Sequence, residues 1–176
     1  MARLSYVAPP GEVTDRILAR RGGRLTALDG MLLHSPGFAD GWNSMLGAVR
    51  GTSTLPADIR ELAMLRVASR NGADYEWVAH EPLARQAGLG DEQIAAIRVG
   101  GSGAASLSAA QWAALGYADA MTMHVTVPEE VFGAVRAHFD ERQVVELTVT
   151  VAAYNMVTRV LVALDVRPGD NPFPAG

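Results

Sequence analysis

The sequence of 176 residues contains no cysteine. Disulfides, thiolate metal sites and thiol nucleophiles are therefore excluded, and the cellular compartment cannot be inferred from redox usage. Basic side chains are also few, 15 against 19 acidic ones, and they form no cluster. Without a basic patch to attract phosphates, neither nucleic acid nor an anionic membrane surface is an expected partner.

An apolar signal-peptide core is missing too, since the chain begins with MARLSYVAPPGE. This absence predicts a cytoplasmic protein. One stretch, residues 143–164, is long and apolar enough to be considered as a membrane span, but it contains Glu146, Asn155 and Arg159, each costly in lipid. We therefore expect a buried helix there and no membrane partner.

Apolar residues make up 49% of the chain, which is ample for one core without disulfides. Proline, glycine and capping residues delimit helical segments near residues 12–21, 25–35, 36–51, 56–70, 73–88, 90–98, 108–123, 128–139 and 140–164. Pro82 should kink or restart the fifth helix just after His80. The sequence thus predicts an all-α fold in a single domain, with an N-terminal arm (1–23), a helical core (24–166) and a tail (167–176).

Residues 61–80, ELAMLRVASRNGADYEWVAH, place three ionisable side chains inside an otherwise apolar helical pair. Glu61 lies on the same helical stripe as apolar residues, and after the Asn71-Gly72 break Glu76 and His80 stand one turn apart. If the two helices pack antiparallel, these residues form an acid/base pair with a second carboxylate nearby.

His80 has two interpretations. It could be a core histidine bonded to a backbone carbonyl. Alternatively, the carboxylate of Glu76 four residues earlier raises the pKa of His80 while burial lowers it, which leaves a group able to act as a general acid or base near neutral pH. Glu61 could instead be a structural partner of Arg60, of Arg66 or of a helix end.

A metal site is a further alternative, because Glu76, His80 and Glu61 carry ligands that suit zinc, manganese or iron. The pattern lacks a second histidine, since the other three lie on other predicted helices and are expected to be surface or packing residues: His34, His124 and His138. We therefore predict neither a metal nor a cofactor.

Several side chains are expected to line a substrate pocket, namely Tyr75, Trp77, Trp42, Met45, Leu46 and Arg66. Aromatic and aliphatic side chains at helical spacing also pack in cores, so the pocket and the core interpretations both stay open. Arg66 or Arg70 could hold a substrate carboxylate with two hydrogen bonds, or could lie solvated on the surface.

The last predicted helix carries polar groups, Tyr154, Asn155 and Arg159, for which a subunit-interface network is favoured over catalysis. Together with the apolar segment LTALDGMLL, this helix has more apolar surface than one small core buries, which predicts a homo-oligomer. The glycine-rich segment at residues 99–106 is expected to be flexible, as a lid or as a plain loop.

Glu61, Ala73, Glu76 and His80 match the spacing of E-x11-C-x2-C-x3-H, the signature of the alkyl hydroperoxidase D-like and carboxymuconolactone decarboxylase superfamily. The similarity extends through LPADIRELAMLRVASRNGADYEWVAHEPLARQAGLGDEQIAAI and, more weakly, through VPEEVFGAVRAHFDERQVVELTVTVAAYNMVTRV, so that it covers residues 32–166. The resemblance implies an alkyl hydroperoxidase D-like helical bundle that assembles as a trimer or a hexamer.

The chain departs from this signature where the two cysteines would stand, at Ala73 and Glu76. Thiol peroxidase chemistry is excluded, because no thiolate exists to attack a peroxide. The cysteine-free branch has a sequence motif similar to Tyr75, Glu76, Trp77 and His80. The resemblance to this branch implies a cofactor-free decarboxylase, isomerase or related lyase that acts on a small organic acid or lactone.

In the expected mechanism His80, supported by Glu76, delivers a proton to the enolate left after CO2 departs, and Glu61 orients this relay. Two alternatives stay open: a metal-assisted lyase that uses Glu61, Glu76 and His80, and a non-catalytic helical oligomer that binds a small molecule or protein. Convergence of the three side chains on one open pocket would favour an enzyme, whereas burial in mutual salt bridges would favour a structural role.

Overall fold

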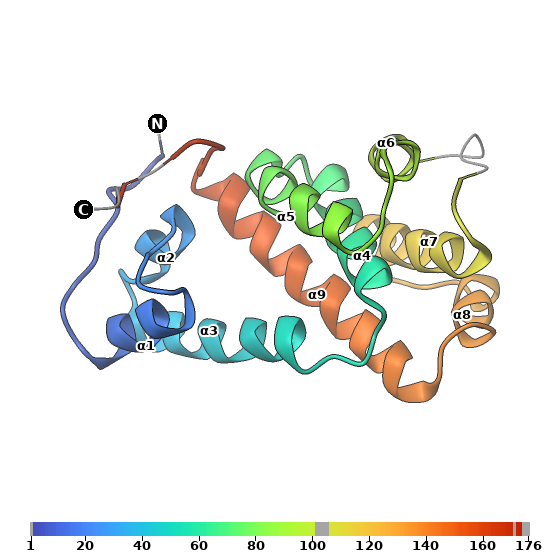
Figure 1. Ribbon diagram of the computed structural model, residues 1–176, viewed down its shortest axis with the longest axis horizontal. Helices are drawn as coiled ribbons and strands as arrows, with labels where there is room; N and C mark the ends of the chain where they lie inside the picture. The colour runs from blue at the N-terminus through green and yellow to red at the C-terminus, as the bar shows by residue number, and fades with distance from the viewer. Residues whose placement is uncertain (1, 101–105, 171, 174–176) are drawn as a thin grey trace. The chain divides into compact units, whose positions relative to one another are not determined.

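The computed structural model describes residues 2–100, 106–170 and 172–173, and within these residues it contains nine α-helices and no strand (Figure 1). The all-α prediction is confirmed. The helices are α1 (Glu12–Arg20), α2 (Ala27–Leu32), α3 (Pro36–Gly51), α4 (Ala57–Arg70), α5 (Asp74–Gln86), α6 (Asp91–Val99), α7 (Ala109–His124), α8 (Glu129–Arg136) and α9 (Glu141–Ala163). Most of the predicted glycine-rich lid or loop, residues 101–105, lies outside the described residues.

Helix boundaries follow the capping signals closely. Ser108 begins α7 as predicted, since its hydroxyl accepts from the backbone N–H of Gln111 at 3.2 Å. The second helix is shorter than the predicted 25–35, because a capping box between Thr26 and Asp29 sets its start and the backbone turns out of the helix after Leu32. Local capping accounts for the start of this helix.

The expected restart after His80 is wrong, because α5 runs unbroken from Asp74 to Gln86 with Pro82 inside it. Proline lacks the N–H that would bond the carbonyl of Val78, four residues earlier. Both Pro82 and Val78 are exposed. The carbonyl thus lies on a solvent-facing side of the helix, where water can replace the missing hydrogen bond.

The chain divides into two compact units, residues 1–52 with 163–176 and residues 53–162. In the first unit α1 and α2 pack against α3, and Ile17 lies at the centre of a small apolar cluster. The two ends of the chain run together there (Figure 1): Arg3 N donates to Leu164 O at 2.9 Å and the Tyr6 hydroxyl donates to Asp170 at 2.5 Å. The single-domain organisation, with its boundaries at residues 23 and 166, stays a prediction.

The second unit is built around α4, which packs against α5, α6 and α7 (Figure 1). Every residue of α4 from Glu61 to Ala68 is buried, as expected for a helix surrounded by others. A helix in this position brings any polar side chain that it carries into a dry environment. The two it carries there are Glu61 and Arg66, and each has a specific set of partners.

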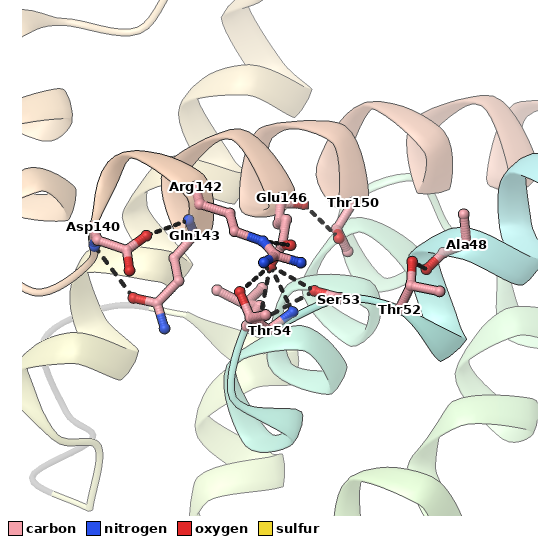
Figure 2. A network of polar contacts seen from close by, with 10 residues as sticks. Ala48, Thr52, Ser53, Thr54, Asp140, Arg142, Gln143, Glu146 and Thr150 are labelled. Carbon is pink, nitrogen blue, oxygen red and sulfur yellow. Dashed lines mark hydrogen bonds and ion pairs between the residues drawn. The ribbon is translucent and has the colours of Figure 1, made fainter.

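Glu146 on α9 fixes the segment that leads into α4 (Figure 2). Its Oε2 accepts from the backbone N–H groups of Thr54 at 2.8 Å and Leu55 at 3.0 Å and from the Ser53 hydroxyl at 3.1 Å, while Arg142 donates to Oε1. Burial raises the pKa of Glu146, but these hydrogen bonds outweigh it and lower the pKa to about 2. A permanent carboxylate therefore holds the start of α4 on α9.

The α9 helix is long and apolar enough to span a membrane by length and composition, although more than half of its most apolar window is buried within the chain. Burial is what the sequence predicted for this segment. Its polar residues have partners inside the second unit: Asn155 donates to the Thr122 hydroxyl on α7 at 2.9 Å and accepts from Asn71 after α4 at 3.1 Å. Asn155 therefore takes part in a network within one chain, and the subunit-interface role stays a prediction.

Candidate functional site

His80 joins the two halves of the α4–α5 hairpin. Its Nδ1 lies 2.7 Å from Oε2 of Glu61, which comes from α4. Both residues are almost completely buried, with 4% of the surface of His80 and 5% of that of Glu61 exposed. An ionised carboxylate can only accept hydrogen bonds, so this contact places a proton on Nδ1 and leaves Nε2 as the exchangeable position.

Two other groups face Nε2. The Tyr154 hydroxyl, from α9, lies 2.9 Å from Nε2, and Oε1 of Glu76, one turn earlier on α5, lies at 3.4 Å. The tyrosine ring stands edge-on to the imidazole, with the ring centroids 5.0 Å apart and the planes at 86°. Three helices, α4, α5 and α9, therefore converge on one histidine.

The electrostatics of this cluster favour a charged imidazole. Burial alone lowers the pKa of His80, but hydrogen bonds to Glu61 and Glu76, together with their negative charges, outweigh burial and raise the pKa above its ordinary value. The cluster contains two carboxylates and one imidazole, all 3 to 5% exposed. It is therefore a buried site in which a proton is held strongly and has more than one acceptor within reach.

A short turn sets this geometry. Gly72 adopts a φ of +63°, a left-handed conformation that suits glycine, and Ala73 N then donates to Ala68 O at 2.9 Å. The side chain of Asn71 in the same turn donates to the Thr158 hydroxyl on α9 at 2.8 Å. The turn that the sequence predicts at Asn71-Gly72 is therefore present, and its hydrogen bonds connect the start of α5 to both α4 and α9.

Other residues predicted for a pocket occupy different surroundings. Trp77 is buried, its Nε1–H donates to Glu81 at 2.8 Å, and Arg98 stacks 4.5 Å from the centroid of its ring. Tyr75 is half-buried on the same helix. Trp42, Met45 and Leu46 belong to α3 in the first unit, where Leu46 is buried and Met45 is exposed, and their place in a pocket stays a prediction.

Arg66 is engaged within the chain, and its place in a substrate pocket stays a prediction. Its guanidinium binds Asp119 through two hydrogen bonds of 2.6 and 2.7 Å and donates to Ile97 O at 2.8 Å. Arg70 binds the same carboxylate at 2.7 and 2.8 Å. Gly100 packs so closely that a Cβ atom there would lie 2.0 Å from an Arg66 nitrogen. Arg66 is a fully buried structural group.

Arg60 is the arginine that stands beside the histidine cluster. Its Nε lies 3.8 Å from Oε1 of Glu61, the oxygen that does not bind His80. This Nε is buried, and among residues 2–100, 106–170 and 172–173 it has no hydrogen-bond partner. The negative charge of Glu61 faces this Nε, but at 3.8 Å it does not form a hydrogen bond with it.

The geometry does not favour the metal alternative. Glu61 binds Nδ1 whereas Glu76 faces Nε2, and these two nitrogens point to different sides of the imidazole ring. A single ion held by one ring nitrogen would therefore meet only one of the two carboxylates. Among the described parts of the chain, no group of three or more histidine, aspartate or glutamate side chains is arranged to hold a metal ion.

Tyr154 is the site residue whose place the sequence analysis missed, since it was assigned to a subunit interface. A signal was present: a tyrosine in a buried aliphatic helix needs a partner for its hydroxyl. The partner, His80, lies 74 residues away in the chain, and no local pattern connects the two. Only the packing of α9 against the hairpin brings them together.

The chain is similar to known proteins in sequence and in fold. Residues 36–120, which include Glu61, Glu76 and His80, match the model of the Carboxymuconolactone decarboxylase family. No significant match was found among curated protein sequences. An alkylhydroperoxidase AhpD core protein from Ralstonia eutropha JMP134 superposes with a TM-score of 0.81 at 22% identity, over 98% of this chain and 94% of that one.

A peroxidase-related protein from Silicibacter sp. TM1040 gives a TM-score of 0.80 at 21% identity, over 96% of this chain and 92% of that one. The debrominase Bmp8, solved in complex with 2,3,4-tribromopyrrole, gives 0.77 at 18% identity, over 98% and 96% of the two chains. These likenesses establish the fold. The family match covers residues 36–120, a segment that contains the histidine cluster, and this segment resembles the Carboxymuconolactone decarboxylase family.

Proposed function

We propose that the chain is an acid/base enzyme, without an organic cofactor, that acts on a small substrate bearing a carboxylate or a lactone. The observation that supports this function best is the convergence of Glu61, Glu76 and Tyr154 on the two ring nitrogens of His80. One nitrogen is anchored and the other exchanges its proton. This is the arrangement that general acid/base catalysis requires.

In the proposed decarboxylation the bond between the substrate carbon and its carboxylate breaks, CO2 leaves, and the electron pair stays on the substrate as an extended enolate. The Nε2 proton of His80 then moves to the carbon, and solvent restores it. No electron is gained or lost. Glu61 holds the imidazole by Nδ1 throughout, while the carboxylate of Glu76 favours the protonated ring before the transfer.

Burial of the cluster suits this chemistry. Loss of a carboxylate charge as CO2 is favoured where water is excluded, because the dry surroundings stabilise the charged reactant less than the dispersed enolate. The same machinery serves an isomerase, a cyclase or a related lyase, since each needs one proton delivered and one removed. The substrate class, rather than the bond that breaks, is what the site constrains.

Arg60 supplies the anchor for an acidic substrate in this proposal, in place of Arg66. Its Nε is buried, lies beside Glu61 and makes no hydrogen bond to the described residues. A guanidinium binds carboxylates through two parallel hydrogen bonds and stays charged at every relevant pH. The Bmp8 complex, which has the same fold and holds 2,3,4-tribromopyrrole, supports a small ligand but not a carboxylate in particular.

A non-catalytic helical protein is the second candidate, and the burial of the cluster supports it. Glu61, Glu76 and His80 are hydrogen-bonded to one another and only 3 to 5% exposed. The cost of burying two carboxylates around one imidazole argues against a purely structural role for the cluster. Such clusters are often less stable than apolar replacements, so a purely structural role gives little reason for their presence.

The test is a screen of small unsaturated acids and lactones for CO2 release or for deuterium uptake in D2O. His80→Ala should lower kcat on a substrate so found by about a hundredfold or more with little change in KM. His138→Ala, at an exposed histidine, is the matched control and should leave kcat unchanged. Full activity in His80→Ala, with only a lower melting temperature, would establish the cluster as structural.

A further inference from the structure

Both ring nitrogens of His80 are already engaged, and the two partners at Nε2 differ in what they can do. A glutamate carboxylate such as Glu76 accepts hydrogen bonds when ionised, whereas a tyrosine hydroxyl both donates and accepts. Tyr154 is fully buried, and its oxygen at 2.9 Å is closer to Nε2 than the Glu76 oxygen at 3.4 Å. The hydroxyl therefore has a function that the carboxylate cannot share.

When His80 is an imidazolium, its Nε2–H can donate to Glu76 or to the Tyr154 oxygen. After the proton leaves, Nε2 carries a lone pair that faces the Glu76 carboxylate, so two acceptors oppose each other in a dry site. A buried acceptor without a donor costs about 1–3 kcal/mol. Among the described residues placed at Nε2, only Tyr154 can supply the donor.

We propose that Tyr154 is a positioning residue for His80, whose hydroxyl donates to Nε2 each time this nitrogen gives up its proton and accepts from it when the proton returns. This inference rests on the proposed acid/base function and extends it. The hydroxyl rotates between two roles while the edge-on contact of the rings holds the imidazole plane in place. The neutral histidine is thereby stabilised in the form that can take a proton again.

The charged groups around His80 come from the two elements of the hairpin. Glu61 and Arg60 lie on α4 and Glu76 lies on α5, and Tyr154 is the group that α9 contributes. Replacing the tyrosine by phenylalanine leaves all three charges in place. It also keeps the ring at the imidazole edge, so a change in the titration of His80 reports the hydroxyl alone.

The experiment is an NMR titration of the full chain with labelled histidine, which is practical because the sequence contains four histidines. His80→Gln identifies the resonance. In Tyr154→Phe the neutral imidazole loses its donor, whereas the imidazolium keeps Glu76, so the titration midpoint of His80 should rise by about one pH unit. The fraction of the neutral ring protonated at Nδ1 should fall as well.

Tyr117→Phe is the matched control. Tyr117 is also buried, and its hydroxyl pairs with the Thr148 hydroxyl at 2.8 Å rather than with a histidine. Its replacement should leave the His80 midpoint where it is. An unchanged or lowered midpoint in Tyr154→Phe would overturn the proposal.

A second variant guards against poor folding. 3-Fluorotyrosine at position 154 keeps the ring and its hydroxyl but makes the hydroxyl a stronger donor, so the midpoint should fall, and a midpoint that does not move again overturns the proposal. The titration needs no substrate, so its failure differs from failure of the proposed function. If the midpoint shifts as expected and His80→Ala retains full turnover, the coupling of Tyr154 to His80 stands and the enzyme assignment fails.

Discussion

Two polar clusters include buried side chains of α4, Glu61 and Arg66, five residues apart in sequence, and they are built in opposite ways. At Asp119 one carboxylate is shared by the guanidinium groups of Arg66 and Arg70, neither of which changes charge at ordinary pH. At His80 two carboxylates surround one imidazole, which does change charge. The first cluster is a fixed clamp between helices, and the second is a site that can exchange a proton.

The two clusters also lose their contributions to stability in opposite directions of pH, one as pH falls and the other as pH rises. Burial raises the pKa of Asp119, but Arg70 and Arg66 outweigh it and lower the pKa, so its contribution to stability is present above the unfolded value of 3.8 and lost as pH falls further. The pKa of His80 is raised, so its contribution is complete below the unfolded value of 6.5 and lost as pH rises through the folded pKa. A structural clamp and a proton site are thereby distinguishable in solution.

The largest expected effect comes from breaking the clamp. Arg66→Ala leaves Asp119 with Arg70 as its partner among the described residues, removes the donor to the carbonyl of Ile97, and opens a space where a fully buried side chain stood. We expect a loss of about 3 kcal/mol in the free energy of unfolding. Urea denaturation measures it.

Arg70→Ala is the matched control for the clamp, since this side chain is more than a third exposed and an exposed pair contributes under about 1 kcal/mol. Equal losses in Arg66→Ala and Arg70→Ala would show that burial does not set the strength of the clamp.

Removing one charge from the proton site should change its titration rather than its fold. Glu61→Gln keeps the shape of the side chain but removes the charge 2.7 Å from Nδ1, so the pKa of His80 should fall and the loss of stability above pH 6.5 should become shallower. Urea denaturation across the pH range and NMR of the histidine both measure this change.

Glu76→Gln acts at 3.4 Å and is expected to give a smaller change of the same sign. In turnover, the basic limb of the pH profile should move to lower pH in both variants. A larger effect from Glu76→Gln would reverse the roles assigned to the two carboxylates.

The third effect concerns the substrate and rests on the proposed function. Arg60→Gln should raise KM for a carboxylate substrate by about tenfold, with kcat little changed, because the guanidinium contributes binding rather than proton transfer. Arg85→Gln, at an exposed arginine paired with Glu81 on α5, is the control and should leave KM alone. An unaltered KM in Arg60→Gln would leave the buried Nε without a role in substrate binding.

How far the sequence could predict this site depends on the distance between partners. Glu76 and His80 lie one helical turn apart and Glu61 lies across one short hairpin, so periodicity and the Asn71-Gly72 turn were sufficient to bring them together. The order of their importance was not predictable, because Glu61 rather than Glu76 makes the short contact with the ring.

Arg66 and Tyr154 show what local patterns leave out. The partner of Arg66, Asp119, lies 53 residues away, and that of Tyr154 lies 74 residues away. The local pattern around a buried arginine does not show whether its guanidinium binds a substrate or a carboxylate elsewhere in the chain. The predicted oligomer remains a proposal, because the partner in such a contact would be a second chain. Exposed side chains do follow one face of α9, as a contact surface would require: Val145, Val149 and Met156.

The smallest effect tests a third carboxylate that serves neither cluster. Glu146 holds the segment before α4 by accepting from two backbone N–H groups, which an amide oxygen would accept less strongly (Figure 2). Glu146→Gln should therefore destabilise the chain by about 1 kcal/mol near neutral pH. Because the pKa of Glu146 is lowered from 4.5 to about 2, its contribution is present above 4.5 and lost as pH falls toward 2. The difference between Glu146→Gln and the parent chain should shrink over that interval in urea denaturation. A difference that stays constant from pH 6 to pH 2 would mean that shape, and not the charge of this carboxylate, anchors the start of α4.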